Sequence, residues 1–103
     1  MNSHGKGSDR SAALYEALLT LKTPEECYSF FADLCTVSEQ MAMEQRFEVA
    51  TLLDSGSIYS DVLEKTGVSS ATVSRVKRSL HYGAGGYRTV LDRFEEQEKE
   101  KTE

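Results

Sequence analysis

Apolar residues recur in six separate stretches of this chain, most of them three or four positions apart. That spacing places side chains on one face of an α-helix, whereas a half-buried strand would alternate apolar and polar residues. The sequence has one proline and seven glycines, so it lacks the frequent breaks that separate short strands. The pattern therefore predicts an all-α fold, with helices over about residues 13–21, 24–35, 37–56, 59–66, 70–81 and 87–94.

Capping residues mark two of the predicted helix starts. Thr23 precedes Pro24, and Glu26 follows three residues after the threonine, which is typical of a capping box. Thr36 and Glu39 repeat the pattern at the next helix. That helix has apolar residues around most of its circumference, so we expect it to be central in the fold.

Several of the predicted helices carry a single apolar stripe. A chain this short has few other residues that could pack against all of these stripes. The stripe of residues 24–35 is apolar enough to be buried against something large. A dimer would bury the stripes of the first, second and last helices against a second copy. We therefore expect a homodimer.

The length of 103 residues allows one domain. We expect residues 1–10 to be disordered, residues 11–95 to form the domain, and residues 96–103 to be a charged tail. No apolar run is long enough to span a membrane, and the start lacks the apolar centre of a secretion signal, so we expect a cytoplasmic protein. Cys27 and Cys35 are too far apart on one helix to bond, and no ligand cluster predicts a metal or cofactor.

Charge is distributed unevenly along the chain, whose net charge is −5. Residues 23–58 carry one cation and seven anions, whereas residues 59–83 carry four cations and two anions. An acidic total disfavours nonspecific binding to polyanions, but contact with phosphates depends on the local field of one face. The charge therefore does not exclude a nucleic-acid-binding protein.

Residues 59–81 match the pattern of a helix-turn-helix. Gly67 permits the positive φ of a tight turn, Val68 can pack inward, and Ser69 can cap the second helix. Val73, Val76 and Leu80 form the stripe that this helix would bury. The opposite face has small, hydroxyl and cationic side chains, which suit the major groove of DNA. The predicted DNA-binding residues are Ser69, Ser70, Ala71, Thr72, Ser74, Arg75, Lys77 and Arg78.

The segments "TGVSSATVSRVKRSL" and "VSEQMAMEQRFEVATLLDSG" resemble the Trp repressor family, as do "LKTPEECYSFFADLCTVSE" and "RSLHYG". Within that family the chain looks most like the repressor-like group called YerC/YecD. The resemblance covers residues 11–95. It implies six helices intertwined in a two-fold homodimer, with the fourth and fifth helices reading a DNA operator.

The resemblance also implies a site for a small corepressor. In tryptophan-binding members the indole lies between two arginines, and a serine and a threonine meet its polar groups. These four residues correspond to Arg46, Arg75, Ser79 and Thr36 here. Each also has a simpler interpretation: Thr36 as a helix cap, Arg46 in ion pairs with nearby glutamates, Ser79 as an ordinary helix residue, and Arg75 on DNA alone.

Two features depart from the tryptophan-binding pattern. Val76 stands where those repressors have a glycine that leaves room for the indole, which argues against L-tryptophan as the effector. Asp61 and Glu64 stand where the repressor has cations near DNA phosphates, so operator preference should differ.

The sequence predicts a DNA-binding transcriptional regulator, and specifically a repressor, whose partner is double-stranded DNA. The alternative is a helical protein-interaction module that keeps the scaffold and binds a partner through the acidic residues 23–58. An enzyme is not expected, because no nucleophile with its base, no metal cluster and no phosphate-binding glycine loop is present in the sequence.

Overall fold

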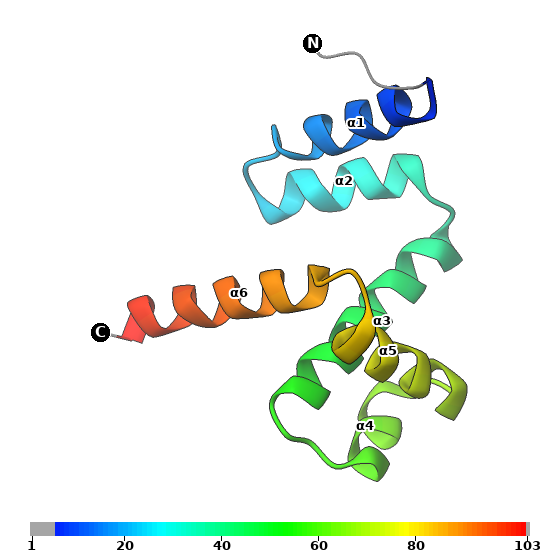
Figure 1. Cartoon of the computed structure of the whole chain (residues 1–103), viewed down its shortest axis with the longest axis vertical. Coiled ribbons are helices and arrows are strands. Elements are labelled where there is room, and N and C mark those ends of the chain that lie inside the picture. The colour runs from blue at the N-terminus through cyan, green and yellow to red at the C-terminus, as the bar shows by residue number, and fades with distance from the viewer. Residues whose placement is uncertain (1–5, 103) are drawn as a thin grey trace. The chain divides into compact units, whose positions relative to one another are not determined.

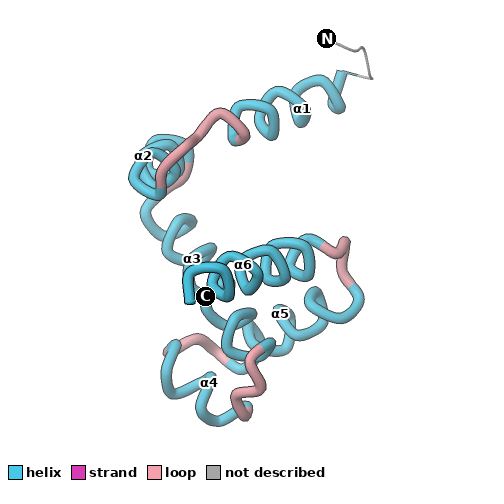
Figure 2. The backbone as a smooth tube through the Cα atoms, turned by 90° about the vertical axis from the view of Figure 1, so that its left-hand side faces the viewer, coloured by secondary structure: helices cyan, strands magenta, loops and turns pink. Residues whose placement is uncertain are grey.

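The computed structural model describes residues 6–102, which form six α-helices joined by short loops (Figure 1). The tube in Figure 2 shows that helices account for nearly all of this part of the chain. Within residues 6–102, no helix is both long and apolar enough to cross a membrane. The helices are α1 (Lys6–Leu18), α2 (Pro24–Leu34), α3 (Val37–Asp54), α4 (Tyr59–Thr66), α5 (Ser70–Tyr82) and α6 (Gly86–Thr102).

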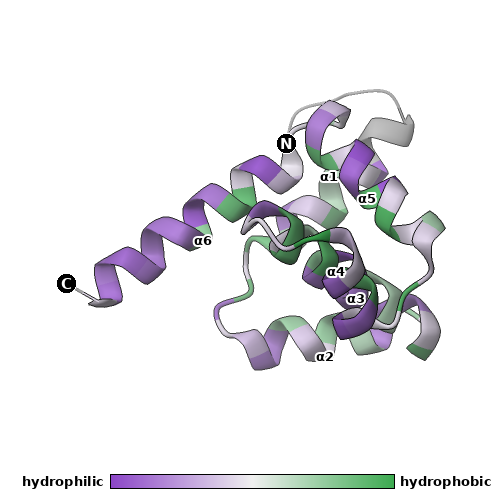
Figure 3. Cartoon of the chain, turned by 90° about the horizontal axis from the view of Figure 1, so that it is seen from below, coloured by the Kyte–Doolittle hydropathy of each residue, from purple (hydrophilic) through white to green (hydrophobic). Residues whose placement is uncertain are grey.

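The expected all-α class and the six helices are confirmed within residues 6–102. Some helix bounds differ: α1 ends at Leu18 rather than near residue 21, and α3 ends at Asp54 rather than near residue 56. The first helix begins at Lys6, so residues 6–10 are helical where disorder was expected. Residues 96–102 were expected as a charged tail that is either a solvated helix end or disordered, and they form the exposed end of α6. Figure 3 shows that α6 becomes hydrophilic toward its C-terminal end. The remaining residues of both expected terminal segments, 1–5 and 103, lie outside the described part of the chain.

The two predicted capping boxes differ in one detail. At α3, the Thr36 hydroxyl accepts from the Glu39 N–H at 3.1 Å, and the Glu39 carboxylate accepts from the Thr36 N–H at 2.8 Å. At α2, Thr23 likewise accepts from the Glu26 N–H at 3.1 Å. The Glu26 carboxylate, however, accepts from the N–H of Lys22 rather than from that of Thr23. Both helix starts are therefore fixed by local hydrogen bonds, as the sequence predicted.

The chain divides into two units, of which the first ends at Gln40. Among residues 10–40, no apolar side chain is buried. The expected burial of the stripe of α2 is therefore not achieved by one chain alone. Gln40 is the buried residue of this segment, and its amide donates to the Tyr28 carbonyl at 3.2 Å. The large apolar residues that stay exposed in this unit are Tyr15, Leu19, Tyr28, Leu34 and Val37.

The second unit, which starts at Met41, contains the hydrophobic core. Its six buried apolar residues come from α3, α4, α5 and α6, and α5 contacts both α4 and α6. Only the second half of α3 contributes to this core, whereas Met41 near its start is 52% exposed. The central role expected for α3 therefore holds for its C-terminal half. The core residues are Val49, Ala50, Val62, Val73, Val76 and Leu91.

Two of the helices, α4 and α5, end at positions that require a glycine. Gly67 ends α4 with a φ of 71°, a left-handed conformation that side-chain-bearing residues adopt at a cost. Gly83 ends α5 for a different reason: its N–H donates to the Ser79 carbonyl at 2.9 Å, and a Cβ atom at Gly83 would overlap that carbonyl oxygen. Both positions thus limit how far the two helices extend.

An ion pair joins the end of α3 to the start of α6. The Arg88 guanidinium donates to both carboxylate oxygens of Asp54, at 2.8 and 3.0 Å, and its Nε donates to Asp92 at 2.9 Å. The hydrogen bonds from Arg88 lower the pKa of Asp54 below its ordinary value of 3.8, while partial burial opposes that shift. The two carboxylates in turn raise the pKa of Arg88. The bidentate pair thus links the start of α6 to the end of α3.

We predict that Asp54→Asn lowers the stability of the protein at neutral pH and that this difference disappears in acid. A carboxylate whose pKa is lower in the folded state stabilises the fold above its ordinary pKa of 3.8, and this contribution is lost as the pH falls through the folded value. Urea unfolding midpoints of the two proteins should converge below that pH. Asp61→Asn is the control, since Asp61 forms no ion pair within residues 6–102. A constant difference at all pH values would contradict the prediction.

Candidate nucleic-acid interface

The turn between α4 and α5 has the geometry that the sequence predicted. Val68 packs against the core, and the Ser69 hydroxyl accepts from the Thr72 N–H at 3.2 Å to cap α5. Because Ser69 holds the first turn of α5 and Gly67 ends α4, the two helices are joined by a short and well-defined connection. The local structure is that of a helix-turn-helix.

The face of α5 that points away from the core is exposed. Val73 and Val76 are 0% and 1% exposed, so the opposite side of the helix must face solvent. It carries three cations, and none of them forms an ion pair within residues 6–102. This surface combines small side chains in the first turns with positive charge further along. Its exposed residues are Ser70, Ala71, Ser74, Arg75, Lys77 and Arg78.

Two of the predicted DNA-binding residues, Ser69 and Thr72, have hydroxyl groups that make contacts within the protein. The Ser69 hydroxyl caps α5, and it also lies 3.1 Å from the Thr72 hydroxyl. Thr72 is only half-exposed. Both side chains therefore shape the start of α5.

The neighbouring surface of α4 differs in charge from that of α5. Asp61 and Glu64 are both exposed, and Lys65 is the cation of this short helix. Positive charge in the helix-turn-helix is thus concentrated on α5.

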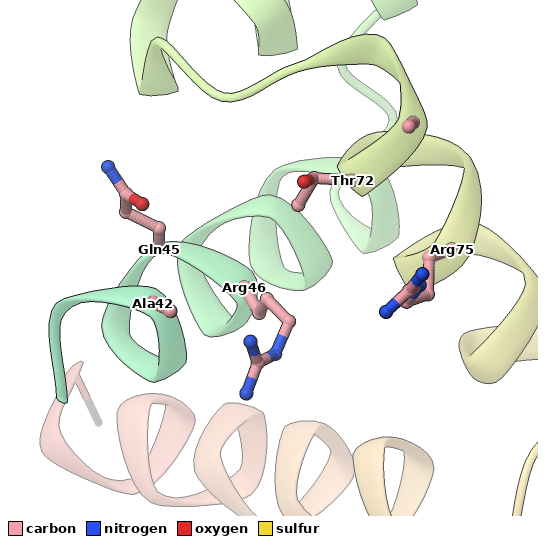
Figure 4. Close-up of a pocket in the computed structure, with 6 residues that line it drawn as sticks. Ala42, Gln45, Arg46, Thr72 and Arg75 are labelled. Atoms are coloured by element: carbon pink, nitrogen blue, oxygen red, sulfur yellow. The ribbon is translucent and has the colours of Figure 1, made fainter. Parts of the chain in front are cut away.

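A cleft of about 190 Å³ lies between the first half of α5 and the middle of α3. Figure 4 shows the side chains of Arg46 and Arg75 extending into it from the two helices. These two arginines are the pair that the resemblance predicted for a corepressor. The cleft is lined by Ala42, Gln45, Arg46, Ala71, Thr72 and Arg75.

Sequence reasoning missed Ala42 and Gln45 as part of this cleft. Ala42 lies one helical turn before Arg46 on α3, so helical spacing was an available signal that these two residues share a face. Gln45 is adjacent to Arg46 in the sequence, and spacing gave no signal for it. The expected alternative for Arg46 is not observed, because within residues 6–102 it pairs with no glutamate.

The other residues implied by the corepressor resemblance are not in the cleft. Thr36 belongs to the first unit, where it caps α3. Ser79 is exposed on α5, outside the set of residues that line the cleft. Val76 does not line it either, because its side chain is buried in the core.

Neither a metal site nor a disulfide is present among the described residues. No group of three or more histidine, cysteine, aspartate or glutamate side chains could hold a metal ion in this part of the chain. Cys27 and Cys35 are free thiols and half-buried. The exposed face of α5 offers hydroxyl groups and positive charge.

Comparisons with known proteins agree with this arrangement. The family described as Trp repressor protein matches residues 10–95. The chain is 48% identical over 89 residues to the uncharacterized protein YerC of Bacillus subtilis strain 168, an alignment that covers 86% of each protein.

Two solved structures are also similar to the chain over most of its length. One is a candidate Trp repressor from Staphylococcus aureus, with a TM-score of 0.78 and 45% identity over 90% of this chain and 96% of that one. The other is a TrpR-like protein from Eubacterium eligens, with a TM-score of 0.79 and 48% identity over 84% of this chain and 89% of that one. The six-helix arrangement is therefore similar to that of Trp-repressor-like proteins.

We predict that Ser69→Ala destabilises the protein whereas Ser70→Ala does not. Loss of a serine N-cap costs about 1 kcal/mol. Ser70 follows the cap, is exposed, and forms no side-chain hydrogen bond within residues 6–102. Urea unfolding of the two variants should show a lower midpoint for Ser69→Ala alone. Equal midpoints would show that the cap does not stabilise α5.

Proposed function

Because this chain belongs to the Trp repressor family, we propose that it is a sequence-specific, DNA-binding transcriptional regulator that acts as a repressor. The observation that carries this proposal is the exposed face of α5. Small residues occupy its first turns, three cations occupy its later turns, and Val73 and Val76 fix this orientation from the buried side. Small side chains allow a helix backbone to approach base edges, and cations further along can hold phosphates.

Each residue of this face has a proposed role. Ser70 and Ser74 donate or accept hydrogen bonds at bases, and Ala71 lies against a thymine methyl group. Lys77 and Arg78 bind phosphates, while Arg75 is shared between DNA and the cleft. Ser69 and Thr72 act at the interface mainly by holding the first turn of α5 in place, because their hydroxyl groups lie together at the cap. The exposed acidic residues of α4 weaken attraction to phosphates, so affinity should depend strongly on α5.

The proposed active form is a homodimer in which the helices of two chains intertwine. Exposed apolar side chains on α1, α2 and the start of α3 support this proposal, since a single chain leaves them in water. A two-fold dimer would present two copies of α5 to half-sites roughly 34 Å apart on one side of the duplex. Dimerisation would thus complete both the packing of the protein and its recognition of DNA.

Regulation by a small effector is the second part of the proposal. Arg46 and Arg75 would contact the effector, and the resemblance adds Thr36 and Ser79 as further candidates. Val76 is 1% exposed, so its side chain fills space that a glycine at this position would leave open. That occupied space argues against L-tryptophan as the ligand.

We predict that reversing two charges on α5 abolishes most of the affinity for DNA. Fragments of genomic DNA selected by the purified protein would supply the operator. On that operator, Lys77→Glu combined with Arg78→Glu should weaken binding at least about tenfold and reduce the slope of log K against log salt by about 2. Fluorescence anisotropy over a range of salt concentrations measures both quantities.

The matched control is the double variant Lys99→Glu and Lys101→Glu, which makes the same change of charge at the end of α6. Its affinity should stay close to that of the unaltered protein. Unchanged affinity in the α5 variant would contradict the assignment of the interface. If the unaltered protein shifts no DNA even at low salt, the protein-interaction function becomes the better explanation.

We predict that the protein sediments as a dimer at micromolar concentration, with twice the 11.5 kDa mass of one chain. Leu19 is 85% exposed, and Leu19→Glu should raise the dimer dissociation constant because it would place a charge in the apolar interface. Thr20→Glu adds the same charge at a neighbouring exposed position and should have a smaller effect. Sedimentation equilibrium distinguishes these outcomes, and a folded monomer would contradict the proposal.

A further inference from the structure

A groove of about 390 Å³, which we call the α3–α6 groove, lies between the end of α3 and the middle of α6. Its apolar part is formed by Leu91, which belongs to the core, and by Phe94, which is 49% exposed. The rest of its wall carries three carboxylates, two hydroxyl groups and no basic residue. The groove therefore combines apolar surface with negative charge. It is lined by Thr51, Asp54, Ser55, Leu91, Phe94, Glu95 and Glu98.

The three carboxylates of the α3–α6 groove are balanced to different degrees. Asp54 is bound by Arg88. Glu98 lies 3.5 Å from Lys101, but both side chains of this ion pair are exposed, and exposed pairs hold their partners weakly. Glu95 forms no ion pair within residues 6–102. The last turn of α3 adds partial negative charge from its carbonyl groups. The groove can thus attract cations from outside the chain.

The C-terminal end of α5 has the opposite charge. This helix contains no acidic residue, and Lys77 and Arg78 are exposed and form no ion pair within residues 6–102. Tyr82, four residues after Arg78, is 86% exposed, and its ring meets that of His81 edge-on at 6.3 Å. Residues four apart lie on one side of a helix, so an exposed aromatic ring stands beside a cation. The end of α5 thus offers positive charge together with apolar surface.

In one chain these two surfaces do not meet. No residue of α5 lines the α3–α6 groove. The burial of Val73 and Val76 turns the exposed face of α5 away from the core, whereas the groove is built on the core residue Leu91. Opposite charges around an aromatic side chain and an apolar hollow are the features of complementary protein surfaces. Each surface is therefore available to a second copy of the chain.

We propose that the end of α5 in one copy docks into the α3–α6 groove of another copy, with Tyr82 against Phe94 and the cations of α5 beside the groove carboxylates. The two surfaces differ, so this contact is head-to-tail and can add further copies, unlike the two-fold contact of the proposed dimer. The docked groove covers cations that are proposed to bind phosphates, so it competes with DNA for α5. This regulatory half rests on the proposed function, whereas the docking itself does not.

The docking is tested by sedimentation velocity of the full chain at low and high ionic strength. Salt screens exposed charges, so the unaltered protein should form larger assemblies at low ionic strength and lose them at high ionic strength. Glu95→Lys combined with Glu98→Lys should weaken this association at least about tenfold, because it places cations against cations. The matched control is Glu96→Lys with Glu100→Lys, which makes the same change of charge on α6 outside the groove and should leave the association intact.

A mixture of two variants tests whether the two surfaces meet each other. Lys77→Glu combined with Arg78→Glu should also remove the assemblies, because it places carboxylates against carboxylates. When this variant is mixed with the groove variant, the reversed α5 of one meets the reversed groove of the other, and the assemblies should return. Circular dichroism verifies that both variants keep the helix content of the unaltered protein. A mixture of two folded variants that stays dissociated would overturn the docking.

The aromatic contact is tested without a change of charge. Tyr82→Ser should weaken the assemblies severalfold, whereas Tyr59→Ser, which removes a 47% exposed tyrosine from α4, should not. The docking is wrong if no larger assemblies form at low ionic strength, or if the control with Glu96→Lys and Glu100→Lys loses them as well. It is also wrong if the groove variant weakens the dimer at high ionic strength, because the groove would then belong to the dimer interface.

The regulatory half is measured on the selected operator at low ionic strength. Operator DNA should dissociate the assemblies of the unaltered protein, and by linkage the assemblies oppose DNA binding. The groove variant should therefore bind the operator severalfold more tightly than the control with Glu96→Lys and Glu100→Lys. Equal affinities would refute the regulation and leave the docking intact. A protein that forms the assemblies but binds no DNA would refute the proposed function alone.

Discussion

The burial of Val73 and Val76 is the contact on which the function of this protein depends. The two valines lie one helical turn apart, and both are excluded from water by α3, α4 and α6. A helix has one rotation about its axis that buries a given pair of side chains. Fixing that rotation presents the serines, the alanine and the cations of α5 on the opposite side. The hydrophobic core therefore determines which residues can meet a ligand, even though no core residue touches one.

The arginines show how tertiary structure gives one residue type two uses. Arg88 lies between two carboxylates and links α3 to α6, so its charge is balanced within the fold. Arg46 and Arg75 line one cleft, and no acidic residue lines it. Neither of these two arginines forms an ion pair within residues 6–102. This contrast distinguishes a structural ion pair from a candidate binding site.

The fully buried apolar side chains are distributed unevenly between the two units of the chain. The second unit encloses a core of valine, alanine and leucine. It still leaves large apolar side chains exposed, among them Tyr82, Val90 and Phe94. Residues 10–40 also form helices, and hydrogen bonds from the N–H groups of Glu26 and Glu39 to threonine hydroxyls cap two helix starts. No apolar side chain among these residues is fully buried, however. Helical hydrogen bonds and caps stabilise secondary structure locally, but most of the stability of a helix comes from packing its apolar face. The first two helices thus pack their apolar faces only in part, because side chains such as Leu14, Leu18 and Phe31 are half-buried.

The sequence by itself determined the helical class, the bounds of α4, the starts of α2, α3 and α5, and the inward side of α5. All of these depend on residues within one or two helical turns of each other, such as Ser69 with Thr72 or Val73 with Val76. It did not predict the start of α1 at Lys6, since polar residues can extend a helix without any apolar pattern. Only the tertiary structure placed Asp54 against Arg88 across 34 residues, and Ala42 and Gln45 beside α5. Such contacts depend on how helices pack, and spacing along the chain carries no record of which distant surfaces will meet.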